Sequence, residues 1–242
     1  MIGVKICGFT NVADAESAVE AGAELLGLNF FAGSKRRIDL ATARAIAAAV
    51  AGRALIVGVF VNHSAAEIHT IAQAVPLDVV QLHGDEPPSL GAELRALEGI
   101  DGATPDKSAS PMPYQLWRAV RCRDEAATAA VVEWVKAFEV AAGRPLDALL
   151  VDAYDANEYG GTGRRADLSV FAALRQRFPH LPLWLAGGLT PENVASAIES
   201  AGPDGVDTAS GVESAPGVKD ADRMRRFVAA VLAAKPIARR SS

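Results

Sequence analysis

The stretch LPLWLAGGLTPENVASAIESAGPDGVDTASG, residues 181–211, contains one complete strand–helix–strand unit. An apolar run at its start ends in a glycine pair, which is typical of a buried strand that leaves a sheet. Thr190 and Pro191 then predict the start of a helix, because threonine caps its first amide groups and proline suits its first turn. Gly202 predicts the end of that helix, and a second apolar run follows over residues 205–209. Two strands joined through a helix are expected to lie parallel.

The same alternation runs along the whole chain. Eight apolar runs, several of them apolar on both faces, predict buried parallel strands at 4–7, 25–30, 55–61, 78–83, 116–120, 148–152, 181–186 and 205–209. Helical patterns lie between them, and five are clear, at 11–22, 40–52, 64–75, 190–202 and 220–235. Asn11 and Gly22 suit the two ends of the first helix, and Ser64 with Glu67 forms a capping box at the third.

Eight strand–helix pairs predict an α/β fold, a single-domain (β/α)8 TIM barrel over residues 1–242. A doubly wound open sheet is the alternative. Against it, the segment CGFTNVAD (7–14) lacks the G-x-G-x-x-G pattern that follows the first strand of many such sheets. Two segments break the alternation: residues 99–113, rich in Gly, Pro, Ser and Asp, predict a flexible insertion, and residues 236–242 predict a frayed tail.

Composition limits the classes of partner. The net charge of −5 gives no basic surface for nucleic acid. The most apolar region, residues 46–61, is interrupted and too short to span a membrane, and no signal peptide is visible at the N-terminus. Two cysteines, Cys7 and Cys122, are compatible with a reducing cytoplasm. Four scattered histidines predict no metal site, and the sequence is compatible with either a monomer or a homodimer.

In a barrel of this kind, reactive groups lie where the strands end. Cys7 ends the first strand and Asp152 ends the sixth, so the two would face each other across the mouth as a base and an acid. Each residue has a simpler reading, since a lone cysteine is usually a small core residue and Asp152 could cap the next helix. Arg36 could clamp a carboxylate or only face water, and His83 could be a core residue or a polar wall of the site.

Glycines after the last three strands predict a phosphate site. Glycine has no side chain, so its backbone amide can approach an anion closely. The face of a barrel at the C-terminal ends of its strands commonly binds phosphate. These loops imply a small phosphorylated substrate. The residues concerned are Gly160 and Gly161 after the sixth strand, Gly187 and Gly188 after the seventh, and Ser210 and Gly211 after the eighth.

Five motifs, in order and nearly from end to end, resemble the phosphoribosylanthranilate isomerase family of tryptophan biosynthesis. They are KICG (5–8), QLHGDE (81–86), LLVDAYD with YGGTG (149–163), LAGGLTPENV (185–194) and GVDTASGVE with PGVKD (205–220). The resemblance implies a (β/α)8 barrel that needs no cofactor or metal. It also implies an Amadori rearrangement of N-(5-phosphoribosyl)anthranilate to 1-(2-carboxyphenylamino)-1-deoxyribulose 5-phosphate.

The resemblance also assigns roles to residues. It implies that Cys7 is the general base, that Asp152 is the general acid, and that Arg36 holds the anthranilate carboxylate. It places Gln81, His83 and Asp207 near the anthranilate part, and the glycines with Ser210 around the phosphate. The chain departs from the family at three positions, with Lys35 in place of a usual proline, Arg37 in place of an aromatic residue, and Ala209 in place of a serine.

Two other functions stay open on the sequence. One is a different phosphosugar barrel, either an indole-glycerol-phosphate synthase, which should carry catalytic lysines at its strand ends, or a histidine-pathway isomerase, which tends to use an aspartate on its first strand. Among the predicted strands only that of residues 4–7 contains a lysine, Lys5, and this strand ends in Cys7. The other is a non-catalytic phosphoribosyl-binding barrel, which would keep the glycine loops but would not need both Cys7 and Asp152.

Overall fold

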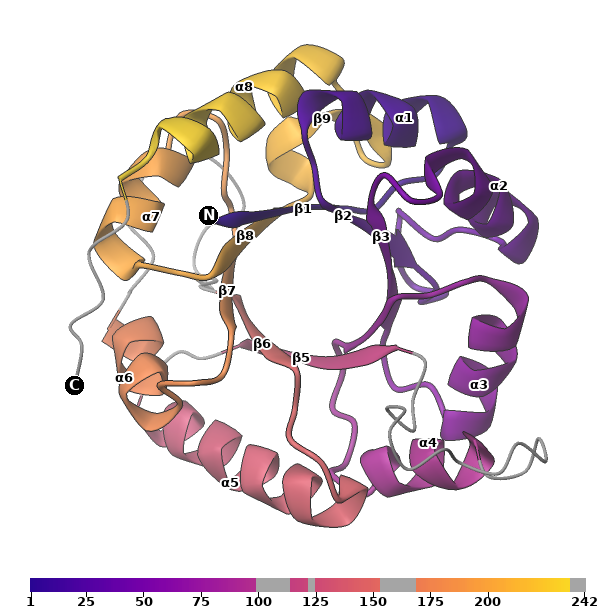
Figure 1. The fold of residues 1–242 in the computed structure, drawn as a ribbon, viewed down its shortest axis with the longest axis vertical. Coiled ribbons are helices and arrows are strands. Elements are labelled where there is room, and N and C mark those ends of the chain that lie inside the picture. The colour runs from indigo at the N-terminus through magenta and orange to yellow at the C-terminus, as the bar shows by residue number, and fades with distance from the viewer. Residues whose placement is uncertain (99–113, 122–124, 153–168, 236–242) are drawn as a thin grey trace.

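The strands of this protein close into a barrel of eight parallel strands, with β8 paired back to β1 (Figure 1). The computed structural model describes residues 1–98, 114–121, 125–152 and 169–235. The single-domain TIM-barrel prediction is confirmed. The barrel strands are β1 (Gly3–Cys7), β2 (Leu25–Asn29), β3 (Leu55–Phe60), β4 (Val79–Leu82), β5 (Gln115–Arg121), β6 (Ala148–Asp152), β7 (Leu183–Ala186) and β8 (Gly205–Thr208).

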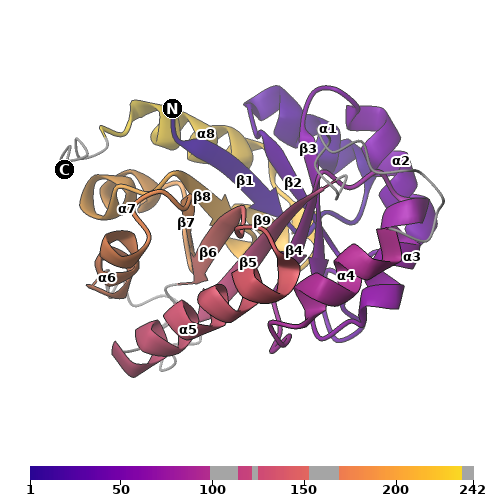
Figure 2. The same ribbon diagram turned by 60° about the horizontal axis from the view of Figure 1, so that its bottom comes forward.

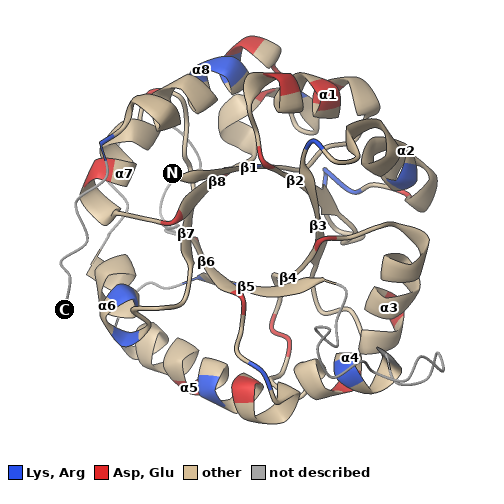
Figure 3. Ribbon diagram, in the orientation of Figure 1, with Lys and Arg blue, Asp and Glu red and all other residues tan. Residues whose placement is uncertain are grey.

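In the part of the chain that the structure describes, eight α-helices surround the barrel and cover its outer face (Figure 2). Among the described residues, none of them is long and apolar enough to cross a membrane. In the view of Figure 3, lysine and arginine are spread around this ring together with acidic residues. The helices are α1 (Val12–Ala21), α2 (Leu40–Val50), α3 (Ala65–Ala74), α4 (Leu90–Glu98), α5 (Glu125–Ala142), α6 (Ser169–Arg177), α7 (Val194–Ala201) and α8 (Ala221–Ala233).

Two predicted helix starts are confirmed. The side chain of Asn11 accepts the Asp14 amide at 2.8 Å, which caps α1, and α1 ends at Gly22 in the left-handed conformation. Ser64 and Glu67 form the predicted capping box of α3. The predicted insertion at 99–113 and the predicted tail at 236–242 lie outside the described residues.

The predicted start of α7 at Thr190 and Pro191 is wrong, because the helix begins at Val194. Asn193 explains the difference. Its side-chain oxygen accepts the Thr190 amide at 2.8 Å, and its side-chain amide donates to the carbonyl of Gly188 at 2.9 Å. Side chains of this type compete with the helix for backbone groups, so the segment forms a turn before the helix starts.

Alternate residues of each strand fill the barrel, and the others pack beneath the helices. Trp117 and Trp184 occupy the interior with ring centroids 4.8 Å apart. Gly3 and Gly205, the first residues of their strands, leave room for Trp184, since a Cβ at Gly205 would lie 2.4 Å from its ring. Large rings therefore fill the barrel near the N-terminal ends of the strands, and the polar side chains lie towards the C-terminal ends.

A short hairpin follows β8 and was not predicted. A 3-10 turn (Ser210–Val212) leads into β9 (Glu213–Ala215), which pairs with β10 (Val218–Lys219). The hairpin lies against the end of β1, because the Thr10 hydroxyl donates to the carbonyl of Gly217 at 2.7 Å. It thereby brings Glu213 and Lys219 to the mouth of the barrel.

Candidate active site

Cys7 and Asp152 are the last residues of β1 and β6 and face the interior of the barrel. Cys7 packs against the interior cluster. Asp152 follows Leu150, a member of that cluster, by two positions and pairs in register with Ala186, which is another member. Gly27 on the neighbouring strand makes room for the thiol, since a Cβ there would lie 2.5 Å from the Cys7 sulfur.

Charged groups surround the Cys7 thiol. Lys5, two residues earlier on the same face, is fully buried and forms an ion pair with Asp207 of β8 at 2.9 Å. Lys219 donates from its ammonium group to the Cys7 carbonyl at 2.6 Å. Burial raises the pKa of the Cys7 thiol and Asp207 adds to this effect, whereas the charges of Lys5 and Lys219 lower it.

Asp152 has the environment of a proton donor. Burial raises the pKa of its carboxyl group above the usual range, the charge of Arg121 opposes this shift, and Asp207 adds to it. One of its oxygens, Oδ1, is buried and has no hydrogen-bond partner among the described residues. A carboxyl group with a raised pKa keeps its proton closer to neutral pH, which suits general acid catalysis.

Gln81 and His83 form a neutral polar wall at the end of β4. The Gln81 side-chain nitrogen lies 2.8 Å from Nδ1 of His83. Burial lowers the pKa of His83 to about 4, and the charges of Lys5, Arg121 and Arg118 act in the same direction. The ring is therefore neutral, and with Nδ1 accepting from Gln81 it offers its Nε2 proton to a ligand.

Arg36 lies near the mouth but is already paired. Its Nε and Nη2 atoms donate to the two carboxylate oxygens of Glu213, each at 2.7 Å. This bidentate pair fixes the plane of the guanidinium group, and Glu213 occupies the edge formed by Nε and Nη2. Only the other edge can serve the carboxylate clamp that the sequence predicted.

The loops after β7 and β8 touch at the predicted phosphate site. Gly187 and Gly188 have φ values of 97° and 61°, in the left-handed region that glycine favours. Gly211 packs so closely on the carbonyl of Leu189 that a Cβ would lie 1.9 Å from its oxygen. The Thr208 hydroxyl donates to the same oxygen at 2.7 Å. Exposed Ser210 begins the 3-10 turn beside them, and the predicted residues Gly160 and Gly161 lie outside the described residues.

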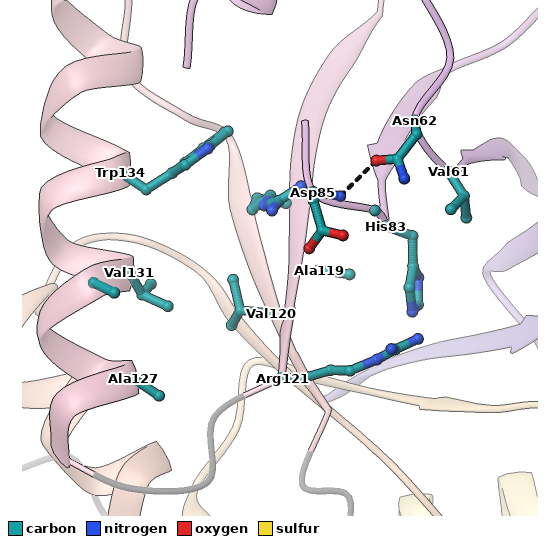
Figure 4. A pocket seen from close by; sticks show the side chains of 13 residues that line it. Val61, Asn62, His83, Asp85, Ala119, Val120, Arg121, Ala127, Val131 and Trp134 are labelled. Carbon is teal, nitrogen blue, oxygen red and sulfur yellow. Dashed lines mark hydrogen bonds between the residues drawn. The ribbon is translucent and has the colours of Figure 1, made fainter. Parts of the chain in front are cut away.

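A pocket of about 360 Å³ opens beside the mouth, between the ends of β3, β4 and β5 and the helix α5 (Figure 4). His83 and Arg121 lie at its inner end, and Trp134 of α5 lines the opposite wall. At the rim of the pocket, the side-chain oxygen of Asn62 accepts a hydrogen bond from the backbone amide of Asp85 at 2.6 Å. Among the described residues, no group of three or more histidine, cysteine or acidic side chains could hold a metal ion.

Sequence reasoning missed four of the charged groups in this region. Period-two alternation could have found two of them, because Lys5 shares a strand face with Cys7, and Arg121 shares one with the interior residue Ala119. Glu213 and Lys219 carried no such signal, since the hairpin that positions them was not predicted.

The chain matches the family model described as N-(5'phosphoribosyl)anthranilate (PRA) isomerase over residues 4–122 and 112–230. The N-(5'-phosphoribosyl)anthranilate isomerase of Acidithiobacillus ferrooxidans is 41% identical over 234 residues, which cover 96% of this chain and 98% of that protein.

Solved structures give the same result. A phosphoribosyl anthranilate isomerase from Thermotoga maritima superposes with a TM-score of 0.78 and 35% identity, over 96% of this chain and 99% of the other. A second Thermotoga structure, of monomers generated from a dimeric form, has a TM-score of 0.74, 34% identity and the same coverage. A third isomerase, in complex with reduced 1-(o-carboxyphenylamino)-1-deoxyribulose 5-phosphate, has a TM-score of 0.74 and 33% identity over 94% of this chain and 97% of the other.

Proposed function

This chain belongs to the N-(5'-phosphoribosyl)anthranilate isomerase family, and from that premise we propose a division of labour in its active site. The protein is the isomerase of tryptophan biosynthesis that converts N-(5'-phosphoribosyl)anthranilate by an Amadori rearrangement. Its substrate is a small phosphorylated molecule. In our proposal Cys7 is the general base and Asp152 the general acid, and the raised pKa of the Asp152 carboxyl is the single observation that best supports it.

The first step in this scheme is ring opening. Asp152, in its protonated form, donates to the ribose ring oxygen as the bond from that oxygen to C1 breaks. The electron pair of the anthranilate nitrogen moves into the bond to C1, which gives a protonated Schiff base. Asp152 suits this step because its pKa is raised by burial, so it holds a proton at a higher pH than an exposed carboxyl group would.

The second step is proton transfer at carbon. The Cys7 thiolate removes the proton from C2, and the electrons neutralise the Schiff base to give an enol-amine. The enol proton then returns to the Asp152 carboxylate while Cys7 delivers its proton to C1. This leaves the ketone at C2 and both groups in their starting states, so protons and electrons balance.

The other polar residues bind the two ends of the substrate. Glycine backbone after β7 and β8, with the Ser210 hydroxyl, supports a phosphate site, because these loops touch and a glycine has no side chain to keep an anion from its amide group. His83, neutral and oriented by Gln81, offers one N–H to the anthranilate side, and Arg36 offers one edge to its carboxylate. Asp207 supports the site by pairing with Lys5.

That pairing argues against the lysine-dependent alternative. A lysine that works as an acid or a nucleophile needs to reach its substrate. Lys5 is fully buried and bonded to Asp207. We also infer a cytoplasmic site of action, because a base that works as a free thiol needs a reducing compartment, and we infer that one copy of the chain suffices for turnover, since β1 and β6 of the same chain carry the proposed base and acid.

Kinetics of single variants test the assignment. Cys7→Ala and Asp152→Asn should each lower kcat by about 10²- to 10⁴-fold, with a small change in KM, because each removes a group that acts in the transition state. Asp222→Asn, an exposed carboxylate of α8, is the matched control and should keep wild-type turnover. Turnover near that of the wild type in either of the first two variants would remove that residue from its role.

A further inference from the structure

A network of ion pairs lies directly behind Cys7, and of its members the mechanism above uses Arg36 alone. Glu213 of β9 binds Arg36 through both of its oxygens and also accepts from the ammonium group of Lys219 at 2.9 Å. Lys219 and Glu213 are both buried. Their distance in sequence from the residues they contact is large, since Arg36 is 177 positions away from Glu213, and Cys7 is 212 positions away from Lys219.

Lys219 connects three separate strand ends. Its ammonium group donates to the carbonyl of Cys7 at 2.6 Å, to the carbonyl of Ala209 at 3.2 Å and to the carboxylate of Glu213. The same ammonium lies 5.5 Å from the ring centroid of Phe9, directly after the KICG segment. Three acceptors and one aromatic face leave it little freedom, so its charge is held in one place beside β1.

Charged groups from several elements lie around the Cys7 thiol. Lys5 of its own strand pairs with Asp207 of β8, and Lys219 of the hairpin and Arg36 of the loop after β2 are two further cations. Glu213 binds both of these cations, and the carboxylate of Asp14 in α1 accepts the backbone amide of Lys219 at 2.8 Å. At the thiol itself, Lys5 and Lys219 favour the thiolate and Asp207 opposes it.

We propose that Lys219 is a positioning residue for the general base: anchored by Glu213, it fixes the end of β1 through the Cys7 carbonyl and holds a cation beside the thiol. This proposal rests on the assignment of Cys7 as the base. The fixed cation favours the thiolate, and so offsets part of the burial that favours the neutral thiol. The anchor matters because burial lowers the pKa of Lys219 itself, and the Glu213 carboxylate opposes that shift.

The rate at which iodoacetamide alkylates Cys7, measured against pH without substrate, tests the proposal. All variants carry Cys122→Ser, so that one cysteine reports. Lys219→Met should raise the apparent thiol pKa by about one unit, so that alkylation below that pKa slows about 10-fold. Lys219→Arg should restore most of the wild-type rate, and Lys136→Met, which removes an exposed lysine of α5, should not change it.

A second variant, with an expected shift of the thiol pKa in the opposite direction, separates the effect of charge from damage to the fold. Asp207→Asn removes an anion that faces the thiol, so it should lower the thiol pKa and speed alkylation at the same pH. Structural damage alone would change the alkylation rate of both variants in the same direction, and that result would overturn the proposal. An unchanged thiol pKa in Lys219→Met would overturn it as well. If Lys219→Met does not fold, Lys219→Gln, which keeps a hydrogen-bond donor without charge, takes its place with the same expected shift.

The pH dependence of kcat/KM distinguishes this proposal from the assignment on which it depends. In Lys219→Met the rising limb of kcat/KM should move to higher pH together with the thiol pKa. If the thiol pKa moves and the rising limb does not follow, the positioning of the thiol stands and the role of Cys7 as base fails. If neither the thiol pKa nor the rising limb moves, the positioning proposal fails, and the kinetics of Cys7→Ala still test whether Cys7 is the base.

Discussion

Gly211→Ala should weaken substrate binding through the phosphate loops. An added Cβ would lie 1.9 Å from the carbonyl oxygen of Leu189, where contacts below 3.0 Å are essentially never seen, so the loops after β7 and β8 must separate by at least about 1.1 Å, the difference of these two distances. A hydrogen bond near 2.9 Å that lengthens by this amount is lost. Loss of one charged hydrogen bond costs about 1.5–3 kcal/mol, which corresponds to a rise in KM of about 10- to 100-fold.

Steady-state kinetics with N-(5'-phosphoribosyl)anthranilate, together with inhibition by inorganic phosphate, would measure this effect. Gly202→Ala is the control for an added methyl group without a clash, because Gly202 has open space around its Cα and ends α7, with a left-handed φ of 59°. It should lose stability by about 1–2 kcal/mol from backbone strain and keep its KM. A folded Gly211→Ala protein with wild-type KM and unchanged inhibition by phosphate would refute the placement of the phosphate at these loops.

Three further perturbations test the charged groups. Arg36→Met should raise KM by about 10- to 100-fold with little change in kcat, because a charged hydrogen bond to the substrate carboxylate is lost; a fall in kcat alone would contradict this. Asp207→Asn should cost about 3–5 kcal/mol in urea unfolding, because Lys5 keeps a buried charge without its anion, and Lys5→Met combined with it should recover part of that loss. Asp152→Asn should raise the melting temperature at neutral pH: the folded-state pKa lies above the unfolded one, so the carboxylate destabilises the fold at higher pH, and the gain should vanish below the ordinary carboxyl pKa.

The local parts of the fold could be predicted from the sequence because their signals are local. Apolar runs of about the length of a strand, and caps such as Asn11 and Ser64, depend on neighbours within a few residues. The start of α7 could not be predicted in this way. The Thr190 hydroxyl does accept the Glu192 amide at 3.2 Å, as a cap would, but Asn193 binds the Thr190 amide and the Gly188 carbonyl, and the helix begins only at Val194. A local rule cannot decide between two such local hydrogen-bonding patterns.

The chemistry of the site shows a different limit. The strand ends that carry Cys7 and Asp152 follow from alternation and from the rule that barrel enzymes react at that face. The ion pairs do not, because Arg36 and Glu213 meet only after the barrel has closed and a short hairpin has folded back over β1. The hairpin has few apolar residues and no regular alternation, so the sequence there resembles a loop.

Burial of the mouth helps one member of the proposed pair and hinders the other. It raises the pKa of both groups, which keeps the proton on the Asp152 carboxyl but also on the Cys7 thiol. The uneven distribution of cations offsets part of this shift at the thiol: Lys5 and Lys219 both lower the pKa of the thiol, whereas Arg121 is the cation that acts on the carboxyl group, and the Asp207 carboxylate opposes these cations at both sites. Two cations therefore favour the thiolate at Cys7 and one favours the carboxylate at Asp152, and the first two proton transfers require a thiolate and a carboxylic acid. The barrel supplies this difference because it places β1 beside the hairpin that carries Lys219 and places β6 on another part of the ring.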